Sequence, residues 1–351
     1  MSLRILVAED SALFSEILVD LLESEEGIEV VGVVDNGEDA VEWCARLRPD
    51  LVVMDIQMPR MDGLAATEAI MATCPTPILV VTADPHRGGV DQSFRALSAG
   101  ALDLMAKPER LPFSREEHQA LVRKVRLLAE IPVVRHVRGR WRGRESKKRG
   151  GGEEALGREE SLSLVGIVAS TGGPRALARI CRELPGDFEG ALLIVQHITE
   201  GFSRHLARWL DQHGQLGVGE ARDGELPRRG RGYLAPTGKH LSLGADGKLR
   251  VEKGDPVGGH CPSGDLLLRS LARHGGSKAI GVVLSGMGTD GTEGLRELYQ
   301  ARCPTLVQDE ETSVIYGMPG SAVEAGVVTE VLSEGDLAER LEYLVRLRRD
   351  P

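Results

Sequence analysis

The sequence feature that most constrains the fold is the stretch L-V-G-I-V-A-S-T-G-G-P, residues 164–174. Its apolar part has the length of a buried strand, and it stops abruptly at Ser170. Pro174 suits the first turn of a helix, where its missing N–H would have no partner in any case. Apolar residues then recur at helical spacing. We therefore predict that Ser170 lies in a tight turn between the carboxyl end of a strand and the start of a helix.

A turn of this kind allows three kinds of chemistry. Free N–H groups and the positive end of a helix dipole stabilise negative charge, so a serine there could be a nucleophile with an oxyanion site beside it. Ser170 or Thr171 could instead simply cap the helix, with the glycines serving the turn. The turn could also bind a phosphate. This stretch alone leaves the three interpretations open.

Composition limits the classes of protein that this chain can belong to. Its 351 residues are enough for two domains with separate cores. A net charge of −10 and an aromatic content of 3% argue against a nucleic-acid surface. The five cysteines are scattered and form no C-x-x-C pair, which favours free thiols in a reducing cytoplasm. We expect no signal peptide and no insertion into a membrane, because the apolar runs are too short.

The first 130 residues alternate apolar, strand-like runs with segments of helical period. Fully apolar strands in such a repeat predict a parallel sheet with helices on both faces. The predicted fold class is therefore α/β, with a (βα)5 arrangement in this part of the chain. The predicted strands are residues 4–8, 30–34, 51–54, 78–82 and 101–106, and the helices begin near Ala12, Glu38, Leu64, Val90 and Arg115.

Polar side chains follow the predicted strands at the edge where ligands of parallel sheets bind. Glu9 and Asp10 follow the first strand, Asp55 follows the third, Thr82 ends the fourth, and Lys107 follows the fifth. Crowded carboxylates repel one another unless a cation joins them, and an all-oxygen cluster suits Mg²⁺. A phosphoryl group on Asp55 would then be held by the metal, by Thr82 and by Lys107. The alternative is that these acids merely begin loops.

A linker is predicted between two domains. After Pro132, the sequence R-H-V-R-G-R-W-R-G-R-E-S-K-K-R-G-G-G is rich in Gly, Arg and Lys and poor in apolar residues. Such a composition buries too little surface to offset the entropy of ordering. We expect residues 126–161 to form a flexible basic linker between a domain at 1–125 and a second domain at 162–351.

The second half again alternates strands and helices. Its predicted fold is a mostly parallel α/β domain of hydrolase type. Residues 232–251 differ, because short alternating pieces separated by Gly and Asp-Gly turns predict an antiparallel β-hairpin at one edge. The predicted parallel strands are residues 164–169, 191–196, 279–284, 305–307 and 327–331.

Three of these predicted strands end in residues that can form a nucleophile, a base and a group that orients the base. Ser170 follows the first, His197 follows the second, and Asp290 lies in a glycine-rich loop after the third. The loop 286–291 could instead bind a phosphate, and Asp290 could be a turn residue. Other histidines compete for the role of base: His205, His213, His240, His260 and His274.

The first half is similar to the receiver domain of two-component response regulators. The motifs V-A-E-D-S, V-V-M-D-I-Q-M-P-R-M-D-G, V-V-T-A and A-K-P carry this resemblance over residues 1–125. It implies that a sensor histidine kinase phosphorylates Asp55 and that Thr82 and Lys107 carry the switch signal. Leu104 stands where the family usually has an aromatic residue. The implied Mg²⁺ ligands are Glu9, Asp10, Asp55 and the carbonyl of Gln57.

The second half resembles the catalytic domain of the CheB family of chemotaxis protein-glutamate methylesterases. The motifs A-S-T-G-G-P, L-I-V-Q-H-I, Y-L-A-P-T-G-K-H-L, P-S-G-D-L-L and S-G-M-G-T-D-G carry this resemblance. It implies Ser170 as nucleophile, His197 as general base and Asp290 as its orienter, with oxyanion donors near Thr171 and Met287. Two positions depart from the family pattern, because Val168 replaces a common glycine and Gly264 replaces an aliphatic residue.

The whole chain thus resembles a phosphorylation-activated serine esterase. The resemblance implies hydrolysis of glutamate γ-methyl esters on methyl-accepting chemoreceptors, with release of methanol, and deamidation of receptor glutamines in some members. We expect a cytoplasmic monomer that needs Mg²⁺ in the receiver domain and no cofactor in the esterase site. We also expect the receiver to block access to Ser170 until Asp55 is phosphorylated. Two alternatives are an inert hydrolase-like adaptor and a regulator that binds nucleic acid through the basic linker.

Overall fold

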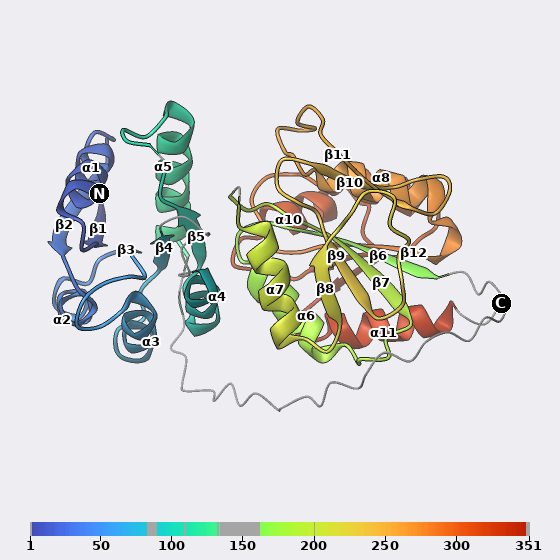
Figure 1. Cartoon of the computed structure of the whole chain (residues 1–351), viewed down its shortest axis with the longest axis horizontal. Coiled ribbons are helices and arrows are strands. Elements are labelled where there is room, and N and C mark those ends of the chain that lie inside the picture. The colour runs from blue at the N-terminus through green and yellow to red at the C-terminus, as the bar shows by residue number, and fades with distance from the viewer. Residues whose placement is uncertain are drawn as a thin grey trace. The chain divides into compact units, whose positions relative to one another are not determined.

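The computed structural model describes residues 2–82, 90–108, 110–131, 133, 162–199 and 201–348. The chain divides into two compact units, Met1–Arg140 and Trp141–Pro351, and each is described by itself (Figure 1). The last helix of the first unit runs to Ala129, past the predicted start of the linker. Most of that predicted linker, residues 134–161, lies outside the described residues, and its predicted flexibility stays a prediction.

The first unit alternates strands and helices, as predicted. Its elements are β1 (Leu3–Ala8), α1 (Ala12–Glu23), β2 (Ile28–Val34), α2 (Gly37–Leu47), β3 (Leu51–Met54), α3 (Gly63–Thr73), β4 (Ile78–Thr82), α4 (Val90–Ala99), β5 (Asp103–Ala106) and α5 (Arg115–Ala129). The strands form one parallel sheet in the order β2-β1-β3-β4-β5. Helices α1 and α5 lie on one face of the sheet, and α2, α3 and α4 lie on the other (Figure 1). The predicted (βα)5 fold is confirmed.

The second unit is also an α/β structure. Its elements are β6 (Ser163–Ala169), α6 (Gly173–Glu183), β7 (Gly190–Gln196), α7 (Ser203–His213), β8 (Gly217–Glu220), β9 (Arg231–Leu234), β10 (His240–Leu243), β11 (Leu249–Glu252), α8 (Gly264–His274), the 3₁₀ helix η2 (Gly276–Lys278), β12 (Ala279–Val283), α9 (Thr292–Gln300), β13 (Thr305–Gln308), α10 (Gly317–Glu324), β14 (Glu330–Leu332) and α11 (Leu337–Leu347). Seven strands form a parallel sheet in the order β14-β13-β12-β6-β7-β9-β8. The mostly parallel α/β fold is confirmed.

The predicted antiparallel hairpin is confirmed for β10 and β11, which pair with each other outside the main sheet. The first piece of the predicted hairpin region was assigned wrongly, because β9 joins the main sheet and pairs in parallel with β7 and β8. Tyr233 and Leu234 are both buried, as expected for a strand covered on both faces. A strand of four residues is too short for its sequence to distinguish a continuous buried run from an alternation of buried and exposed side chains. Strand β8 was not predicted, since Val218 is its single apolar side chain.

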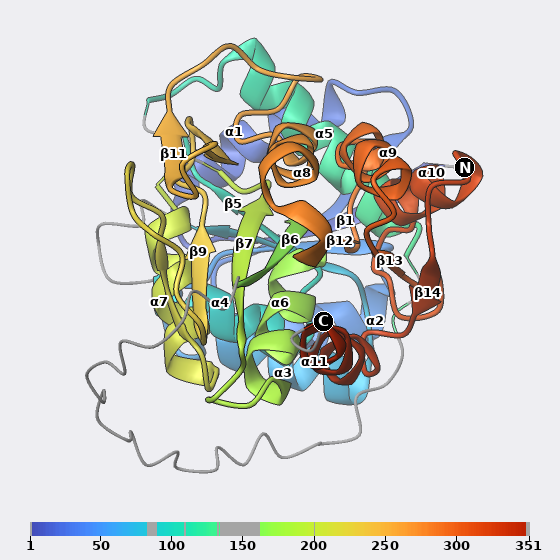
Figure 2. The same ribbon diagram turned by 90° about the vertical axis from the view of Figure 1, so that its right-hand side faces the viewer.

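Two layers of helices cover the second sheet. Helices α6, α7 and α11 lie on one face, and α8, α9 and α10 lie on the other (Figure 2). The central strands β6 and β7 are buried along their whole length, which explains their unbroken apolar sequences. Within the described residues, no helix combines the length and the apolar character needed to cross a membrane.

Strand register sets which residues meet at the carboxyl edge of the second sheet. Val168 pairs with Val283 of β12, and Ala169 pairs with Gln196 of β7. The loops that follow β6, β7 and β12 therefore begin beside one another. Each of these loops carries one of the polar residues singled out in the sequence.

Candidate active site

Ser170 directly follows β6, in the turn before α6, as predicted. Its N–H donates to the Ser285 carbonyl at 3.0 Å, and its own carbonyl accepts from the Gly173 N–H at 2.8 Å and from Gln196 Nε2 at 2.7 Å. Gly172 has a φ of 81°, a backbone conformation that side chains with a Cβ rarely adopt. Hydrogen bonds to Gln196 at the end of β7 and to Ser285 after β12 therefore fix the backbone of the turn. No hydrogen bond within the described residues engages Ser170 Oγ.

His197 begins the loop after β7. Its N–H donates to the Ala169 carbonyl at 2.9 Å, which places its backbone beside the strand end that leads to Ser170. Nε2 of the ring lies 2.8 Å from Asp290 Oδ2, and Nδ1 is buried without a hydrogen-bond partner. Since a carboxylate accepts hydrogen bonds, we assign the ring proton to Nε2. The lone pair on Nδ1 then remains available to take a proton.

The Asp290 carboxylate is enclosed by hydrogen-bond donors. Oδ1 accepts from Ser263 Oγ at 3.0 Å and from the Asp265 N–H at 2.9 Å, and Oδ2 accepts from the Gly264 N–H at 2.6 Å. These donors lie at the start of α8, where the helix dipole also favours negative charge. Burial by itself would raise the pKa of Asp290, but His197 and the N–H groups of Asp265 and Gly264 lower it to about 2. The carboxyl group is therefore ionised at neutral pH.

Sequence reasoning missed Ser263, Gly264 and Asp265 as partners of Asp290. The sequence P-S-G-D does carry a signal, because a serine before a helix marks free N–H groups that can bind an anion. Its spacing, however, gives no indication that this helix start meets the loop after β12. Only the fold brings the two together.

The structure brings His197 and Asp290 into direct contact and places Ser170 beside His197. Ser170 and His197 each follow a residue of the register pair Ala169–Gln196, and neighbouring strands are about 4.8 Å apart. The side chain of Gln196 donates to the carbonyls of both residues, at 2.7 Å and 3.0 Å. No hydrogen bond among the described residues joins Ser170 Oγ to Nδ1 of His197. Such bonds often tighten only when substrate binds.

The histidines that competed for the role of base have other surroundings. Nδ1 of His205 and of His213 lies 3.2 Å and 2.8 Å from a backbone carbonyl oxygen one turn earlier. His240 accepts from the Ser263 N–H at 3.2 Å, and His274 is exposed at the end of α8. His260 differs from these, because its ring stacks on that of His197 with centroids 4.1 Å apart. Among these histidines, His197 is therefore the one whose ring is hydrogen-bonded to a buried carboxylate. It follows β7, the strand that pairs with the one leading to Ser170.

Thr171 and Met287, the predicted oxyanion donors, lie on the loops after β6 and β12. Thr171 is buried directly after Ser170, and its carbonyl accepts from Ser285 Oγ at 2.8 Å. The side chain of Met287 is exposed, and no acceptor within the described residues binds its N–H. An N–H group without a protein partner is what an oxyanion donor requires.

The glycine-rich loop 286–291 was also a candidate phosphate site. It contains the Asp290 carboxylate, whose pKa is lowered to about 2 and which therefore carries a negative charge. A buried negative charge repels a phosphate. The surroundings of this loop therefore favour the pairing of Asp290 with His197.

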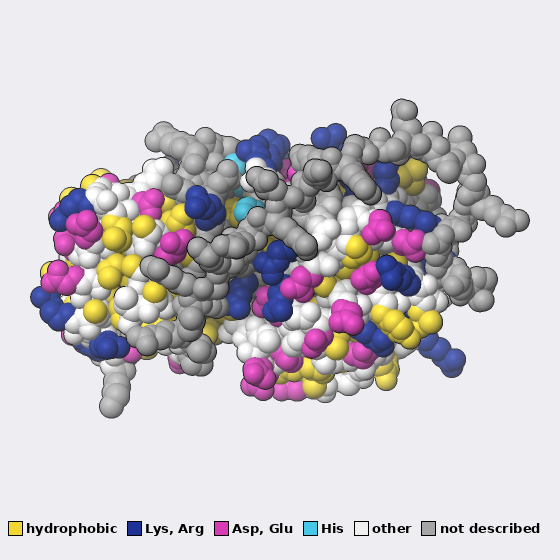
Figure 3. All heavy atoms as spheres, turned by 90° about the horizontal axis from the view of Figure 1, so that it is seen from below, with side chains coloured by type: hydrophobic (Ala, Val, Ile, Leu, Met, Phe, Trp, Pro, Cys, Tyr) yellow, Lys and Arg dark blue, Asp and Glu magenta, His cyan; other side chains and the backbone are white. Residues whose placement is uncertain are grey.

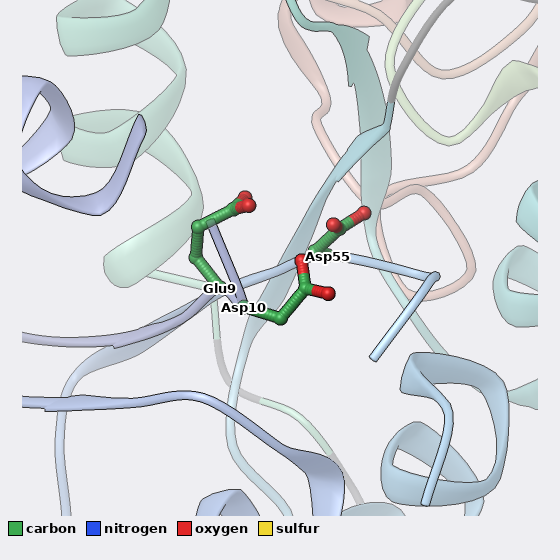
Figure 4. Close-up of side chains that lie close together, drawn as sticks. All are labelled: Glu9, Asp10 and Asp55. Carbon is green, nitrogen blue, oxygen red and sulfur yellow. The ribbon is translucent and has the colours of Figure 1, made fainter. Parts of the chain in front are cut away.

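A second group of polar side chains lies at the carboxyl edge of the first sheet. Glu9 and Asp10 follow β1, Asp55 follows β3, and one carboxylate oxygen from each lies within 4.8 Å of the others (Figure 4). Lys107 Nζ lies 2.7 Å from Glu9 and 2.8 Å from Asp55. Among the described residues, Lys107 is the cation paired with two of these three carboxylates, so this acidic cluster could bind a metal ion.

The electrostatics of the cluster support this interpretation. Burial raises the pKa of Glu9, and the negative charge of Asp55 raises it further, while Lys107 acts in the opposite direction. Burial would lower the pKa of Lys107, but Asp55 and Glu9 raise it overall. A cation would relieve the repulsion between Glu9 and Asp55, so the residues present fit a divalent metal.

The other predicted residues of this site lie around the cluster. Thr82 is buried at the end of β4, and its carbonyl accepts from the Lys107 N–H at 2.7 Å. The Gln57 N–H donates to Asp55 at 3.3 Å, and the role of its carbonyl stays a prediction. Leu104 is buried in β5. The aromatic neighbour of Lys107 is Phe14 of α1, whose ring centroid lies 4.7 Å from Nζ.

Comparisons with known proteins agree with both halves of this description. A family model for the response regulator receiver domain matches residues 5–116, and one for CheB methylesterase matches residues 165–341. Protein-glutamate methylesterase/protein-glutamine glutaminase 2 of Anaeromyxobacter dehalogenans is 44% identical over 344 residues, which cover 98% of this chain and 97% of that protein. Protein-glutamate methylesterase/protein-glutamine glutaminase 4 of Myxococcus xanthus is 44% identical over 348 residues, with coverage of 98% and 97%.

A solved structure, the Thermotoga maritima CheB methylesterase catalytic domain, is similar to the second unit. It is 39% identical in sequence with a TM-score of 0.51, and the match covers 52% of this chain and 99% of that chain. The family predicted from the sequence is therefore confirmed. The chain belongs to the CheB methylesterase family and carries a response regulator receiver domain ahead of its methylesterase domain.

Proposed function

We propose that the protein is a phosphorylation-activated serine esterase that hydrolyses glutamate γ-methyl esters on methyl-accepting chemoreceptors. The observation that carries this proposal is the ring of His197, bound through Nε2 to Asp290 at 2.8 Å, with an unpartnered Nδ1 beside the turn of Ser170. Relatives that match nearly the whole chain are named protein-glutamate methylesterase/protein-glutamine glutaminase. The proposal therefore includes deamidation of receptor glutamines at the same site.

In the proposed acylation step, Ser170 Oγ attacks the ester carbonyl while Nδ1 of His197 takes the hydroxyl proton. The electron pair of the carbonyl moves onto its oxygen, and this oxyanion accepts hydrogen bonds from N–H groups near Thr171 and Met287. One such donor commonly contributes about 3–4 kcal/mol to transition-state stabilisation. The tetrahedral adduct collapses as the C–O bond to the methoxy group breaks, and His197 returns the proton to release methanol.

Deacylation repeats these steps with water. His197 takes a proton from the water molecule, which attacks the glutamyl ester of Ser170, and the proton then returns to Ser170 Oγ. With a glutamine substrate, the leaving group of the first step is ammonia. Asp290 fixes the ring proton on Nε2 and stabilises the charged ring that forms twice in the cycle. The side chains of Ser170, His197 and Asp290 supply nucleophile, base and orienter, so we propose no cofactor in the esterase site.

The proposed receiver chemistry takes place at Asp55. A sensor histidine kinase donates the phosphoryl group, and Glu9, Asp10 and Asp55 would hold Mg²⁺, with the Gln57 carbonyl as a further ligand. When bound, the metal offsets the negative charge of the carboxylates and the phosphoryl group. Lys107 and Thr82 act as the switch residues that contact the phosphoryl group. The two acids and the lysine already surround Asp55, which supports these roles.

We further propose a cytoplasmic monomer that inserts into no membrane and binds no nucleic acid. Its net charge of −10 supports the last point, because nucleic-acid binding relies on basic surfaces. On the face shown in Figure 3, basic and acidic side chains are interspersed over the coloured surface. The proposed domains are a receiver that ends with α5 at Ala129, a basic linker that follows it up to residue 161, and a methylesterase domain at 162–351.

Methanol release from methylated chemoreceptor tests the proposal. We expect the full-length protein to release methanol, a small-molecule phosphodonor with Mg²⁺ to accelerate the release, and Ser170→Ala to abolish it. As a control, Ser242→Ala on β10 should retain the activity, because that serine lies outside the site. Receptor demethylation by Ser170→Ala at the rate of the unmodified protein would contradict the proposal.

A further inference from the structure

The ring of His260 packs face to face on the ring of His197. The two centroids are 4.1 Å apart, and the ring planes differ by 3°. No hydrogen bond within the described residues engages the ring nitrogens of His260. The stacking contact is therefore directed at the ring that holds Asp290, and no competing polar contact accounts for its orientation.

The loop that carries His260 is anchored on both sides. His260 and Val257 exchange two backbone hydrogen bonds, at 3.0 Å and 3.1 Å. On the other side, Ser263 and Gly264 donate to the Asp290 carboxylate. One loop thus holds the carboxylate that binds His197 and also covers the face of the His197 ring.

His260 is suited to this position only as a neutral ring. Burial lowers its pKa, and the charge of His197 lowers it further, while Asp290 acts in the opposite direction. A second positive ring at this distance would repel a charged His197 ring, whereas a neutral ring would not. A neutral His260 is therefore compatible with a His197 ring that becomes positively charged during the reaction.

We propose that His260 is a positioning residue, whose stacked ring holds the plane of His197 so that Nδ1 points toward Ser170 while Nε2 stays on Asp290. The bond to Cβ and the hydrogen bond from Nε2 to Asp290 anchor the His197 ring at two points but leave rotation about the line between them open. A flat neighbour in contact with one ring face removes this rotation and excludes water from that face. Small errors in the position of a base cost rate, and a displacement of about 1 Å can cost 100-fold.

The kinetic test compares three variants of the full-length protein with methylated receptor and phosphodonor. We expect His260→Ala to lower kcat for methanol release by about 10- to 100-fold with little change in KM. His260→Phe keeps a flat ring that cannot titrate and should recover most of the lost rate. His274→Ala, at an exposed histidine on the end of α8, should match the unmodified protein. An unchanged kcat in His260→Ala, or a rise in KM alone, would overturn the proposal.

A second measurement does not depend on turnover. In protein labelled with ¹⁵N-histidine, the Nε2–H proton of His197 should give a low-field NMR signal, because it lies in a short bond to a carboxylate. We expect this signal to broaden by exchange with water in His260→Ala and to persist in His260→Phe and His274→Ala. A sharp signal in His260→Ala would overturn the positioning role.

The inference depends on the proposed function, but the two can fail separately. If the unmodified protein releases no methanol, the proposed esterase is wrong, whatever the NMR signal shows. If the unmodified protein is active and His260→Ala is equally active, only the role of His260 is wrong. The midpoint of thermal unfolding is measured for each variant. A midpoint equal to that of the unmodified protein excludes a general loss of structure as the cause of a lower rate.

Discussion

Asp55 and Asp290 are both buried carboxylates at the carboxyl edge of a parallel sheet, but their surroundings differ in charge balance. Asp290 accepts four hydrogen bonds, three from the start of α8 and one from His197, and the carboxylate of the neighbouring Asp265 is bound separately by the N–H groups of Gly291 and Gly294. Asp55 lies within 4.8 Å of carboxylate oxygens of Glu9 and Asp10, and Lys107 is the ammonium group paired with it. A charge with full compensation can hold a neighbouring ring in place. A cluster with excess negative charge can bind a cation.

The largest expected effect comes from removing the charge of Asp290. Asp290→Asn should lower kcat for methanol release by about 10⁴-fold, because the amide no longer fixes the ring proton on Nε2 of His197. The rate is measured with methylated receptor under saturating phosphodonor. Asp246→Asn is the matched control, since Asp246 pairs with Arg250 on the surface. If Asp290→Asn lost less than tenfold, the carboxylate would not be the orienter.

Asp55 should be needed for regulation and not for the chemistry of ester hydrolysis. Asp55→Asn should therefore lose all stimulation by phosphodonor and keep the basal rate of the unphosphorylated protein. The measurement is methanol release with and without phosphodonor and Mg²⁺. The matched control is Asp20→Asn on the exposed side of α1, which should respond normally. Stimulation by phosphodonor that persists in Asp55→Asn would show that a residue other than Asp55 is phosphorylated.

The next effect concerns a packing contact behind Asp290. A Cβ on Gly264 would lie 2.2 Å from Cγ1 of Val168, so a side chain at this position must shift either Val168 or the backbone whose N–H binds Asp290. Gly264→Val should lower the free energy of unfolding by about 1–3 kcal/mol, as overpacking typically does. It should also lower the rate of ester hydrolysis. Denaturant unfolding and methanol release check the two effects.

The double variant Val168→Gly/Gly264→Val sharpens this prediction. Removing the valine opens the space that the new side chain needs, so the pair should recover most of the stability and rate lost in Gly264→Val. Additive losses in the double variant would show that the two positions do not share one space.

The residues Val168 and Gly264 also show what the sequence could and could not reveal. Each stood out separately as a departure from the family pattern, yet their contact becomes visible only when α8 lies against β6. Ser170, His197 and Asp290 could be predicted because each follows an apolar run that reads as a buried strand. Ser263 and His260 could not be assigned their neighbours, since a loop has no period that indicates where it packs.

The smallest expected effect concerns metal binding to the receiver. At a Mg²⁺ concentration tenfold above its dissociation constant, binding to the folded state should add about 1.4 kcal/mol to stability. Thermal unfolding with and without Mg²⁺ measures this shift, and Asp10→Asn should reduce it. Glu29→Gln on β2 is a control on the same sheet, away from the cluster. An equal shift in Asp10→Asn would place the metal outside the acidic cluster.

Covalent labelling of the nucleophile tests the central claim most directly. The full-length protein is treated with a fluorophosphonate, a reagent that reacts with activated serine hydroxyls, and the modified residue is identified by mass spectrometry of its peptides. The account predicts one adduct, on Ser170, which forms far more slowly in Asp290→Asn and is absent in Ser170→Ala. An adduct on another residue, or equal labelling of Ser170 in Asp290→Asn, would contradict it.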